Sequence, residues 1–234
     1  MIAIPSKDWG NLDSPWVSVE MDIWDALIKN RPRTRYRAYQ EIFWQDKQHS
    51  SVYIVAKGRV CISILHSSGQ QKHLYIACTG AMFGEIACIL SQSHVTTATA
   101  ITETELYCIP SLEVQRLFHN EACLADWMLQ YEARKNRLLI SQITMLAFEK
   151  APQRISRLLL CLYENYGRET SDGTLLNIRF TCTELAAIAN TSRVTANKTM
   201  LGFIHDGILA KEKSLYIIRD VEKLREIANR AEED

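Results

Sequence analysis

The sequence lacks the long apolar runs of a membrane protein and the leader of a secreted one. Its longest uncharged stretch, residues 86–102, is interrupted by Ser, Gln, His and Thr, so it does not suit a bilayer. Only residues 1–4 are apolar before Pro5 and the charged Lys7 and Asp8, which leaves no signal-peptide core. We therefore expect a cytoplasmic protein with no membrane partner.

Closely spaced cysteines are also lacking. The chain has 7 cysteines, an odd number, and no two of them lie within four residues of each other. This excludes CxxC zinc and thioredoxin patterns and does not resemble a secreted disulfide framework. We interpret them as buried or half-buried free thiols, with a redox switch as the alternative.

Catalytic signatures and an excess charge are missing as well. The sequence contains no HExxH, GxSxG, P-loop or dinucleotide fingerprint, so we expect neither an enzyme nor a required cofactor or metal. Lys and Arg number 27 and so do Asp and Glu, which gives no global signal for nucleic acid. Residues 179–219 are locally basic, and local clustering matters more than the total because charges act over about 10 Å.

What is present is enough for two modest domains. The 234 residues are 47% hydrophobic and 23% charged, which is typical of a soluble globular protein. We divide the chain into residues 1–120, a long helix over 121–148, and residues 149–234.

The first part reads as an arm followed by short strands. Trp9, Trp16, Ile23 and Trp24 are apolar anchors of an arm with one short helix. Alternating apolar residues and glycine turns then predict strands near 52–55, 60–64, 72–77, 96–101 and 105–109. Several short strands of this kind indicate an antiparallel barrel or roll.

A long helix follows a short one that opens at Ser111. Asn120 is a candidate cap for the long helix, which runs without Gly or Pro to Phe148 and is about 40 Å long. An apolar residue recurs every seven positions, which favours a two-helix interface and hence a homodimer. The predicted interface residues are Leu124, Met128, Tyr131, Leu138 and Met145, with Ile143 near the same stripe. Packing on the chain's own roll is the alternative, and one helix can serve both.

Residues 181–218 predict a winged helix-turn-helix, after a helix over 153–166 and a strand over 175–180. Thr181 or Thr183 can cap a helix over 184–189, and a turn at 190–192 leads to a second helix over 193–205. Ala186 is small where the helices cross, and Asn190 suits the left-handed turn residue. Strands over 208–211 and 215–218 form the wing.

The second of these helices carries side chains suited to a major groove. Asn197 pairs bidentately with adenine, Val194 meets a thymine methyl, and Arg193 bonds guanine or phosphate. An A·T-rich duplex is the expected partner; a generic helix-loop-helix with a polar surface is the alternative. The predicted DNA-binding residues are Thr183, Ser192, Arg193, Val194, Thr195, Asn197, Lys198 and Lys213.

This order of elements resembles the Crp–Fnr superfamily of bacterial regulators. The resemblance rests on residues 53–60, on Gly80 to Ile86, and on Thr181 to Lys198. It implies an α+β fold with an N-terminal antiparallel β-roll of the cyclic-nucleotide-binding type (a double-stranded β-helix), a long dimerisation helix and a C-terminal winged helix-turn-helix. It also implies double-stranded DNA, a second copy and RNA polymerase as partners. The chlorophenol-sensing members, of halorespiration type, look most similar because of the Ala98-Thr99-Ala100 connection and the Val194-Thr195 pair.

The same resemblance implies a small-molecule effector between the roll and the long helix. The residues that face this pocket by analogy are Tyr75, Gly84, Glu85, Thr96, Thr97, Tyr131 and Arg134. The family's cyclic-nucleotide cassette places Arg-Ser where this chain has Thr96-Thr97, which removes the bidentate partner of a cyclic phosphate. We therefore expect an aromatic or phenolic acid rather than cyclic AMP. A cyclic-nucleotide-responsive regulator and a thiol or haem redox sensor are the alternatives, although no cysteine precedes Cys61.

Overall fold

The computed structural model describes residues 14–48 and 51–230, and Trp9 lies outside them. The chain divides into two compact units, one with residues 15–136 and the other with residues 137–230. The long helix α4 (Ala122–Phe148) is divided between the units, so it belongs to both. The three-part division that we predicted stays a prediction.

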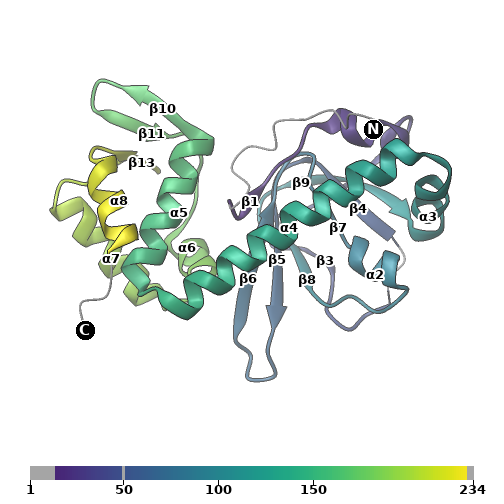
Figure 1. Ribbon diagram of the computed structural model, residues 1–234, viewed down its shortest axis with the longest axis horizontal. Helices are drawn as coiled ribbons and strands as arrows, with labels where there is room; N and C mark the ends of the chain where they lie inside the picture. Colours follow the sequence, from purple (N-terminus) through teal and green to yellow (C-terminus); the bar gives the residue numbers. More distant parts are fainter. Residues whose placement is uncertain (1–13, 49–50, 231–234) are drawn as a thin grey trace, which may run out of the picture. The chain divides into compact units, whose positions relative to one another are not determined.

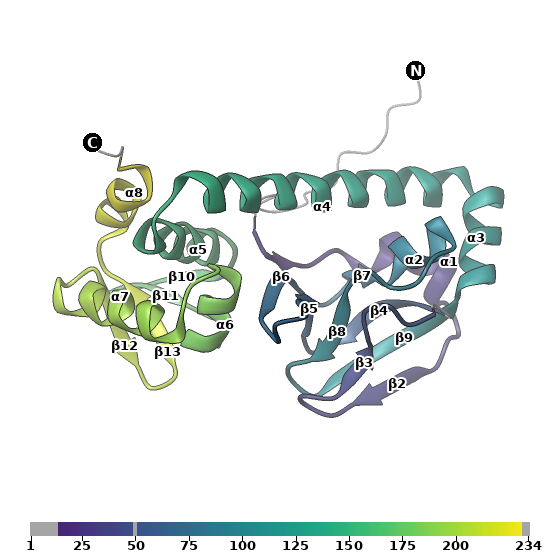
Figure 2. The same cartoon turned by 90° about the horizontal axis from the view of Figure 1, so that it is seen from below.

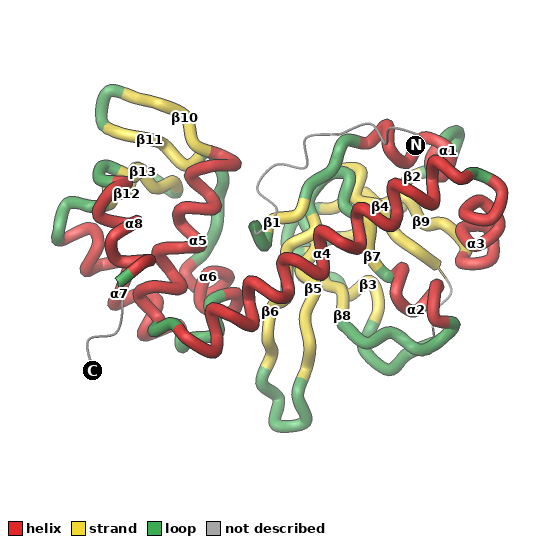
Figure 3. Tube along the Cα trace, viewed as in Figure 1, coloured by secondary structure: helices red, strands yellow, loops and turns green. Residues whose placement is uncertain are grey.

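The first unit is an antiparallel β-roll (Figure 1). Two sheets form it in the described residues, with strand orders β1-β6-β5-β8-β3 and β2-β9-β4-β7. Every pair in them is antiparallel except β1 with β6. The strands are β1 (Trp16–Val17), β2 (Arg33–Tyr36), β3 (Glu41–Phe43), β4 (Ser51–Lys57), β5 (Val60–Leu65), β6 (Gln71–Ala77), β7 (Met82–Phe83), β8 (Thr97–Ala100) and β9 (Thr104–Pro110). The five central strands predicted from the sequence are thereby confirmed, and the hairpin of β5 and β6 projects from the roll (Figure 3).

The arm is held to the roll by two buried tryptophans. Trp16 and Trp24 are 2% and 0% exposed, and Trp24 Nε1 donates a 2.8 Å hydrogen bond to the Gly80 carbonyl. Gly80 has a φ of +81°, and a Cβ there would meet the Val19 carbonyl oxygen at 1.7 Å, so only glycine fits. A 3₁₀ turn (Met21–Trp24) and α1 (Asp25–Ile28) form the predicted short helical segment.

Three helices complete this unit. They are α2 (Glu85–Leu90), α3 (Ser111–Asn120) and the first half of α4. Ser111 opens α3 as predicted, but Asn120 is the last residue of α3 and lies before Glu121, outside α4. Figure 2 shows α3 at the start of α4 and α2 beneath the first half of α4. This arrangement brings Glu85, the first residue of α2, close to α4.

The second unit is a winged helix-turn-helix. Its elements are α5 (Ala151–Tyr166), β10 (Gly167–Thr170), β11 (Gly173–Leu176), α6 (Cys182–Ile188), α7 (Arg193–His205), β12 (Leu209–Glu212), β13 (Leu215–Ile218) and α8 (Val221–Asn229). The sheet order is β10-β11-β13-β12, and α8, which we did not predict, packs on α5.

One strand was predicted too long. The strand expected over 175–180 is observed as β11, which begins at Gly173 and ends at Leu176. The Asn177 amide donates to the Tyr166 carbonyl at 2.9 Å, and the Phe180 ring stacks on Tyr216 with centroids 5.2 Å apart. Phe180 is therefore part of the core because its ring is buried against Tyr216, although it does not lie in a strand.

Candidate nucleic-acid interface and effector site

Local capping places the two helices of the helix-turn-helix. Thr181 caps α6: its hydroxyl accepts from the Glu184 amide at 3.0 Å, and the Glu184 carboxylate accepts from the Thr181 amide at 2.7 Å. Asn190 takes the left-handed turn conformation with a φ of +51°. Ser192 then caps α7 by accepting from the Thr195 amide at 3.0 Å. Of the two threonines offered by the sequence, Thr181 is the cap.

The inner face of this motif is fully packed. Five residues of the two helices are buried there, namely Leu185, Ala186, Ala189, Ala196 and Met200, and Ala186 is the small residue predicted at the crossing. Because these positions fix which side of α7 faces inward, they also fix which side is left outside.

The outer face of α7 contains every side chain that we predicted on it. Arg193, Val194, Asn197 and Lys198 are exposed, and Val194 is 77% accessible despite being apolar. Leu201, which is 56% accessible, lies one turn beyond and was missed by the sequence analysis. Its i+7 spacing from Val194 was the available signal. Thr183, Ser192 and Thr195 are exposed nearby, although the Ser192 and Thr195 hydroxyls also contact each other at 2.8 Å.

The wing adds a basic tip. Lys213 lies in the turn between β12 and β13 with a φ of +53° and is exposed. Within the described part of the chain, Arg193, Lys198 and Lys213 form no ion pair with an acidic residue. Their charges are therefore available to an external anion.

A thiol not singled out in the sequence lies behind the outer face. Cys182 Sγ is 3.9 Å from Asn197 Oδ1 and 3.9 Å from the Tyr216 hydroxyl. Burial, together with this thiol, raises the pKa of Tyr216 to about 12, so its hydroxyl stays protonated at neutral pH.

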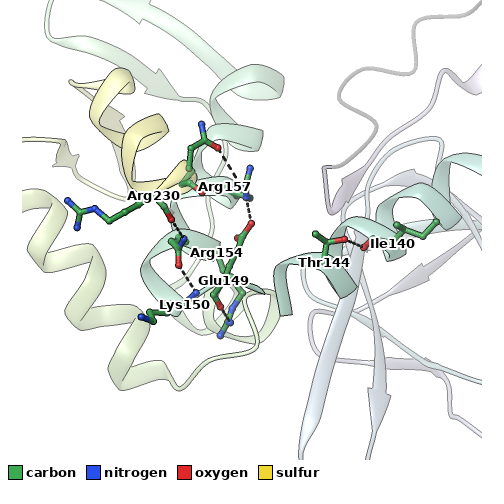
Figure 4. Close-up of polar contacts among 10 residues, drawn as sticks. Ile140, Thr144, Glu149, Lys150, Arg154, Arg157 and Arg230 are labelled. Carbon is green, nitrogen blue, oxygen red and sulfur yellow. Dashed lines mark hydrogen bonds and ion pairs between the residues drawn. The ribbon is translucent and has the colours of Figure 1, made fainter. Parts of the chain in front are cut away.

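Two arginines of α5 fix the junction between α4 and the helix-turn-helix. Arg154 donates to three carbonyls, those of Glu149, Ala189 (2.7 Å) and Asn190 (3.3 Å). Arg157 pairs with the Glu149 carboxylate and donates to the Ala228 carbonyl at 3.0 Å (Figure 4). The chain just after α4 is thus joined to the turn that precedes α7 and to the end of α8.

In the roll, a buried ion pair occupies part of the predicted effector site. Lys135 of α4 forms an ion pair with Glu85 of α2, and the two side chains are 5% and 1% exposed. Glu132 is a second carboxylate, 2.9 Å from the same ammonium. The rings of Tyr131 and Tyr75 are also close, with centroids 5.2 and 5.9 Å from Lys135 Nζ. Sequence reasoning identified Glu85 and both tyrosines but missed Lys135.

Electrostatics keep this cluster charged at Lys135 and neutral at the tyrosines. Burial lowers the pKa of the Lys135 ammonium, but Glu85, Tyr75, Glu132 and Tyr131 together outweigh burial, and the pKa is raised well above its usual value. For the tyrosines burial has the opposite effect and raises the pKa of Tyr75 and of Tyr131. The Tyr131 hydroxyl donates to the Met82 carbonyl at 2.8 Å and accepts from the Met82 amide at 3.0 Å, which fixes its ring.

The remaining predicted effector residues have other contacts. Thr97 Oγ1 accepts from the Gln45 amide at 3.1 Å, and Arg134 donates to the Ser18 carbonyl at 2.7 Å. Gly84 is the N-cap of α2 with a φ of +82°, and Thr96 is half-buried just before β8. The contacts around Lys135 therefore connect only Tyr75, Glu85 and Tyr131 among the seven predicted residues.

The predicted dimer seam needs a correction. Leu124, Met128, Tyr131, Leu138 and Met145 are all buried within the chain, between 0% and 7% exposed, so this stripe packs inside the protomer. A different stripe of α4 is exposed at alternating spacings of four and three residues. It consists of Ala122, Asp126, Leu129, Ala133, Asn136, Ile140, Ile143 and Ala147. The seven-residue repeat is present in α4, but its more apolar stripe is buried within the protomer, and the exposed stripe is the less apolar one.

Among the described helices none has the length and apolarity needed to cross a membrane. Groups of three or more His, Cys, Asp or Glu side chains arranged to hold a metal are absent from residues 14–48 and 51–230.

Each of the two units contains a region that matches a known protein family. Residues 33–121 match the family described as Cyclic nucleotide-binding domain, and residues 153–227 match the Crp-like helix-turn-helix domain. The chain is a Crp–Fnr family regulator. The family pairs a roll with a winged helix-turn-helix, as this structure does, and the relatives of this chain are transcription regulators rather than enzymes.

Individual relatives of this Crp–Fnr regulator are distant but cover most of its length. The Cyclic AMP receptor protein of Thermus thermophilus is 28% identical over 204 residues, which are 87% of this chain and 91% of the relative. The CRP-like cAMP-activated global transcriptional regulator of Mycobacterium tuberculosis is 25% identical over 199 residues, 85% of this chain and 89% of the relative.

Solved structures support the same fold. A mutant of CooA from Carboxydothermus hydrogenoformans has a TM-score of 0.76 at 20% identity, covering 87% of this chain and 90% of that one. CprK in complex with OCPA has a TM-score of 0.74 at 15% identity, covering 94% and 99%. At these identities the likeness shows the fold and does not transfer a ligand.

Proposed function

We propose that this Crp–Fnr regulator is a homodimer that binds an A·T-rich palindrome in duplex DNA under the control of a small molecule other than cyclic AMP. The outer face of α7 carries the proposal, because it presents Arg193, Asn197 and Lys198 together and exposed. Such a regulator acts where genomic DNA and RNA polymerase are, so we place it in the cytoplasm and expect polymerase as a partner.

Base readout follows from the chemistry of this face. Asn197 offers the amide that pairs with adenine N6 and N7, and Val194 offers an apolar surface for a thymine methyl. Arg193 and Lys198 supply positive charge for phosphates, and Lys213 extends this charge onto the wing. Thr183, Ser192 and Thr195 are near this face in the sequence and are exposed. Their hydroxyls can therefore add contacts to the DNA backbone.

A second copy is the occupant that we assign to the exposed stripe of α4. The stripe keeps the four-three spacing of a coiled-coil seam over most of the helix. Leu129, Ile140 and Ile143 are 71%, 58% and 66% exposed in the single chain, and alanines between them allow a close approach. A symmetric dimer built this way would read two half-sites about 34 Å apart.

The effector proposal rests on the roll. Two relatives are named as cyclic AMP receptors or cyclic AMP-activated regulators, but this chain has Thr96-Thr97 in place of the phosphate-binding pair. An aromatic or phenolic acid is the class that we favour, since two tyrosine rings lie close to a buried cation. That cation is Lys135 rather than Arg134, so an acid entering the roll would compete with Glu85 for the ammonium.

Selection of binding sites from a random duplex library tests the proposal. The full-length protein is expected to enrich a palindrome with A·T-rich half-sites, and fluorescence anisotropy on the enriched duplex then gives the affinity. Failure to enrich any duplex, or enrichment of G·C-dominated half-sites, would contradict it.

A further inference from the structure

The roll holds the Lys135 side chain in the way that a protein holds a bound organic cation. The ammonium is buried close to the rings of Tyr75 and Tyr131 and is paired with the Glu85 carboxylate. An aromatic surround combined with a carboxylate is the arrangement by which proteins recognise ammonium ligands. Here the cation comes from the chain itself.

The pair is expected to add little net stability. A buried ion pair is often no more stabilising than two apolar residues of the same volume, because both charges lose their hydration. Removing one partner alone, however, leaves an uncompensated buried charge. The contact is thus a selective link that fixes the position of α2 against α4.

This link lies on the helix that leads to the DNA-binding unit. From Lys135, α4 continues without interruption to Phe148, and α5 begins at Ala151. Beyond α4, Arg154 connects the chain at Glu149 to the turn before α7. Fixing the rotation and register of α4 on the roll therefore acts on the element that continues toward the recognition helix.

We propose that Lys135 is an internal ligand of the roll, and that its pairing with Glu85 makes the connection between roll and α4 that an effector would otherwise make. The ligand-free protein then binds DNA without an added small molecule, and the acid of the proposed function would act by taking Lys135 from Glu85 and so weakening this binding. This inference rests on the proposed DNA-binding function.

The test uses full-length protein freed of small molecules and the duplex obtained by site selection. The variant Glu85→Met/Lys135→Met replaces the pair by apolar side chains of similar volume. Both this variant and its reference protein carry Glu132→Gln, because the Glu132 carboxylate would otherwise lose its cation. Relative to that reference, the variant is expected to keep the melting temperature but to bind DNA about 10-fold more weakly, within the range of measured allosteric couplings. The control Arg31→Met/Glu113→Met removes another ion pair of the same unit, with an N–O distance of 2.5 Å, and is expected to leave DNA affinity unchanged.

Each outcome decides the inference. Wild-type protein that binds DNA only after a small molecule is added overturns it while leaving the proposed function intact. A double variant with the affinity of its reference protein also overturns it. If the double variant does not fold, Glu85→Asp replaces it: this variant keeps the charge but shortens the reach to Lys135, so lower affinity supports the inference and unchanged affinity refutes it. A wild-type chain that enriches no duplex refutes the proposed function and this inference together.

Discussion

Arg154 donates a 2.7 Å hydrogen bond from Nε to the carbonyl of Ala189, the C-cap residue of the first helix of the helix-turn-helix. The same guanidinium reaches the Asn190 carbonyl and, on its other side, the Glu149 carbonyl. A fork with several donors is what this geometry requires, and lysine cannot reproduce it. The turn before α7 is therefore positioned by a residue of α5.

Arg154→Ala is expected to lower the free energy of unfolding by about 2 kcal/mol, because carbonyls lose a charged partner. Arg154→Lys should recover only a minor part of this loss. Chemical denaturation of full-length protein measures both. Arg225→Ala, at an exposed i,i+3 pair with Glu222, is the matched control and should cost less than about 0.5 kcal/mol. Equal losses in the two alanine variants would contradict the role of Arg154.

Ile143→Glu is expected to dissociate the proposed dimer, because it places a charge in the exposed stripe of α4. Sedimentation velocity at micromolar concentration should show a monomer that is still folded. Leu112→Glu, at an apolar residue of α3 that is 81% exposed, should stay dimeric. Leu138→Glu should instead destabilise the chain itself, because Leu138 is buried. An Ile143→Glu protein that sediments as a dimer would exclude the stripe as the interface.

Val194→Glu is expected to shift preference toward a G·C pair at one position of the half-site. A carboxylate accepts from cytosine N4, and the change should amount to roughly 1–3 kcal/mol of discrimination. Competition binding with single-base variants of the selected duplex measures it. Lys198→Ala serves for comparison: it should weaken all sequences alike and reduce the salt slope by about one unit. A Val194→Glu protein with unaltered preference would show that α7 is docked differently.

Glu132→Gln is expected to make stability less dependent on pH. Burial raises the pKa of Glu132 above the ordinary value of 4.5, with Lys135 opposing and Glu85 reinforcing the change. Since the folded state favours the protonated form, wild-type protein should gain stability as pH falls from neutral toward the ordinary Glu pKa. The variant lacks this gain and should be at least as stable as wild type at neutral pH. Chemical denaturation across this pH range measures the stability of both proteins, and Glu212→Gln, at an exposed residue, is the control. Identical pH profiles of stability for Glu132→Gln and wild type would contradict the prediction.

Cyclic AMP is expected to give no binding heat in calorimetry at micromolar concentrations. Thr96-Thr97 provides no guanidinium for the cyclic phosphate, and the Glu85 carboxylate is already paired with Lys135. The variant Glu85→Met/Lys135→Met should be equally silent, because it still lacks the phosphate partner. Micromolar binding to wild-type protein would restore the cyclic-nucleotide alternative.

Local sequence determined the DNA-binding half of this protein. Helix α7 has the limits predicted for it, Arg193–His205, because its cap, its turn residue and its buried small residues all lie within a few positions of it. The wing was predicted with an offset of one residue in its first strand, which is observed as Leu209–Glu212. Strands of the roll were predictable for the same reason, since alternation and glycine turns are short-range signals.

Only the tertiary structure decided how the long helix is used. A helix with several apolar stripes does not specify by itself which stripe faces inward; here Leu138 is buried, while Ile140 and Ile143 are exposed. Likewise Lys135 reads as an ordinary helical lysine until the fold brings it to Glu85, fifty positions away in the chain. Burial, rather than residue type, converts that lysine into a structural cation, and burial depends on contacts between segments that the linear sequence does not display.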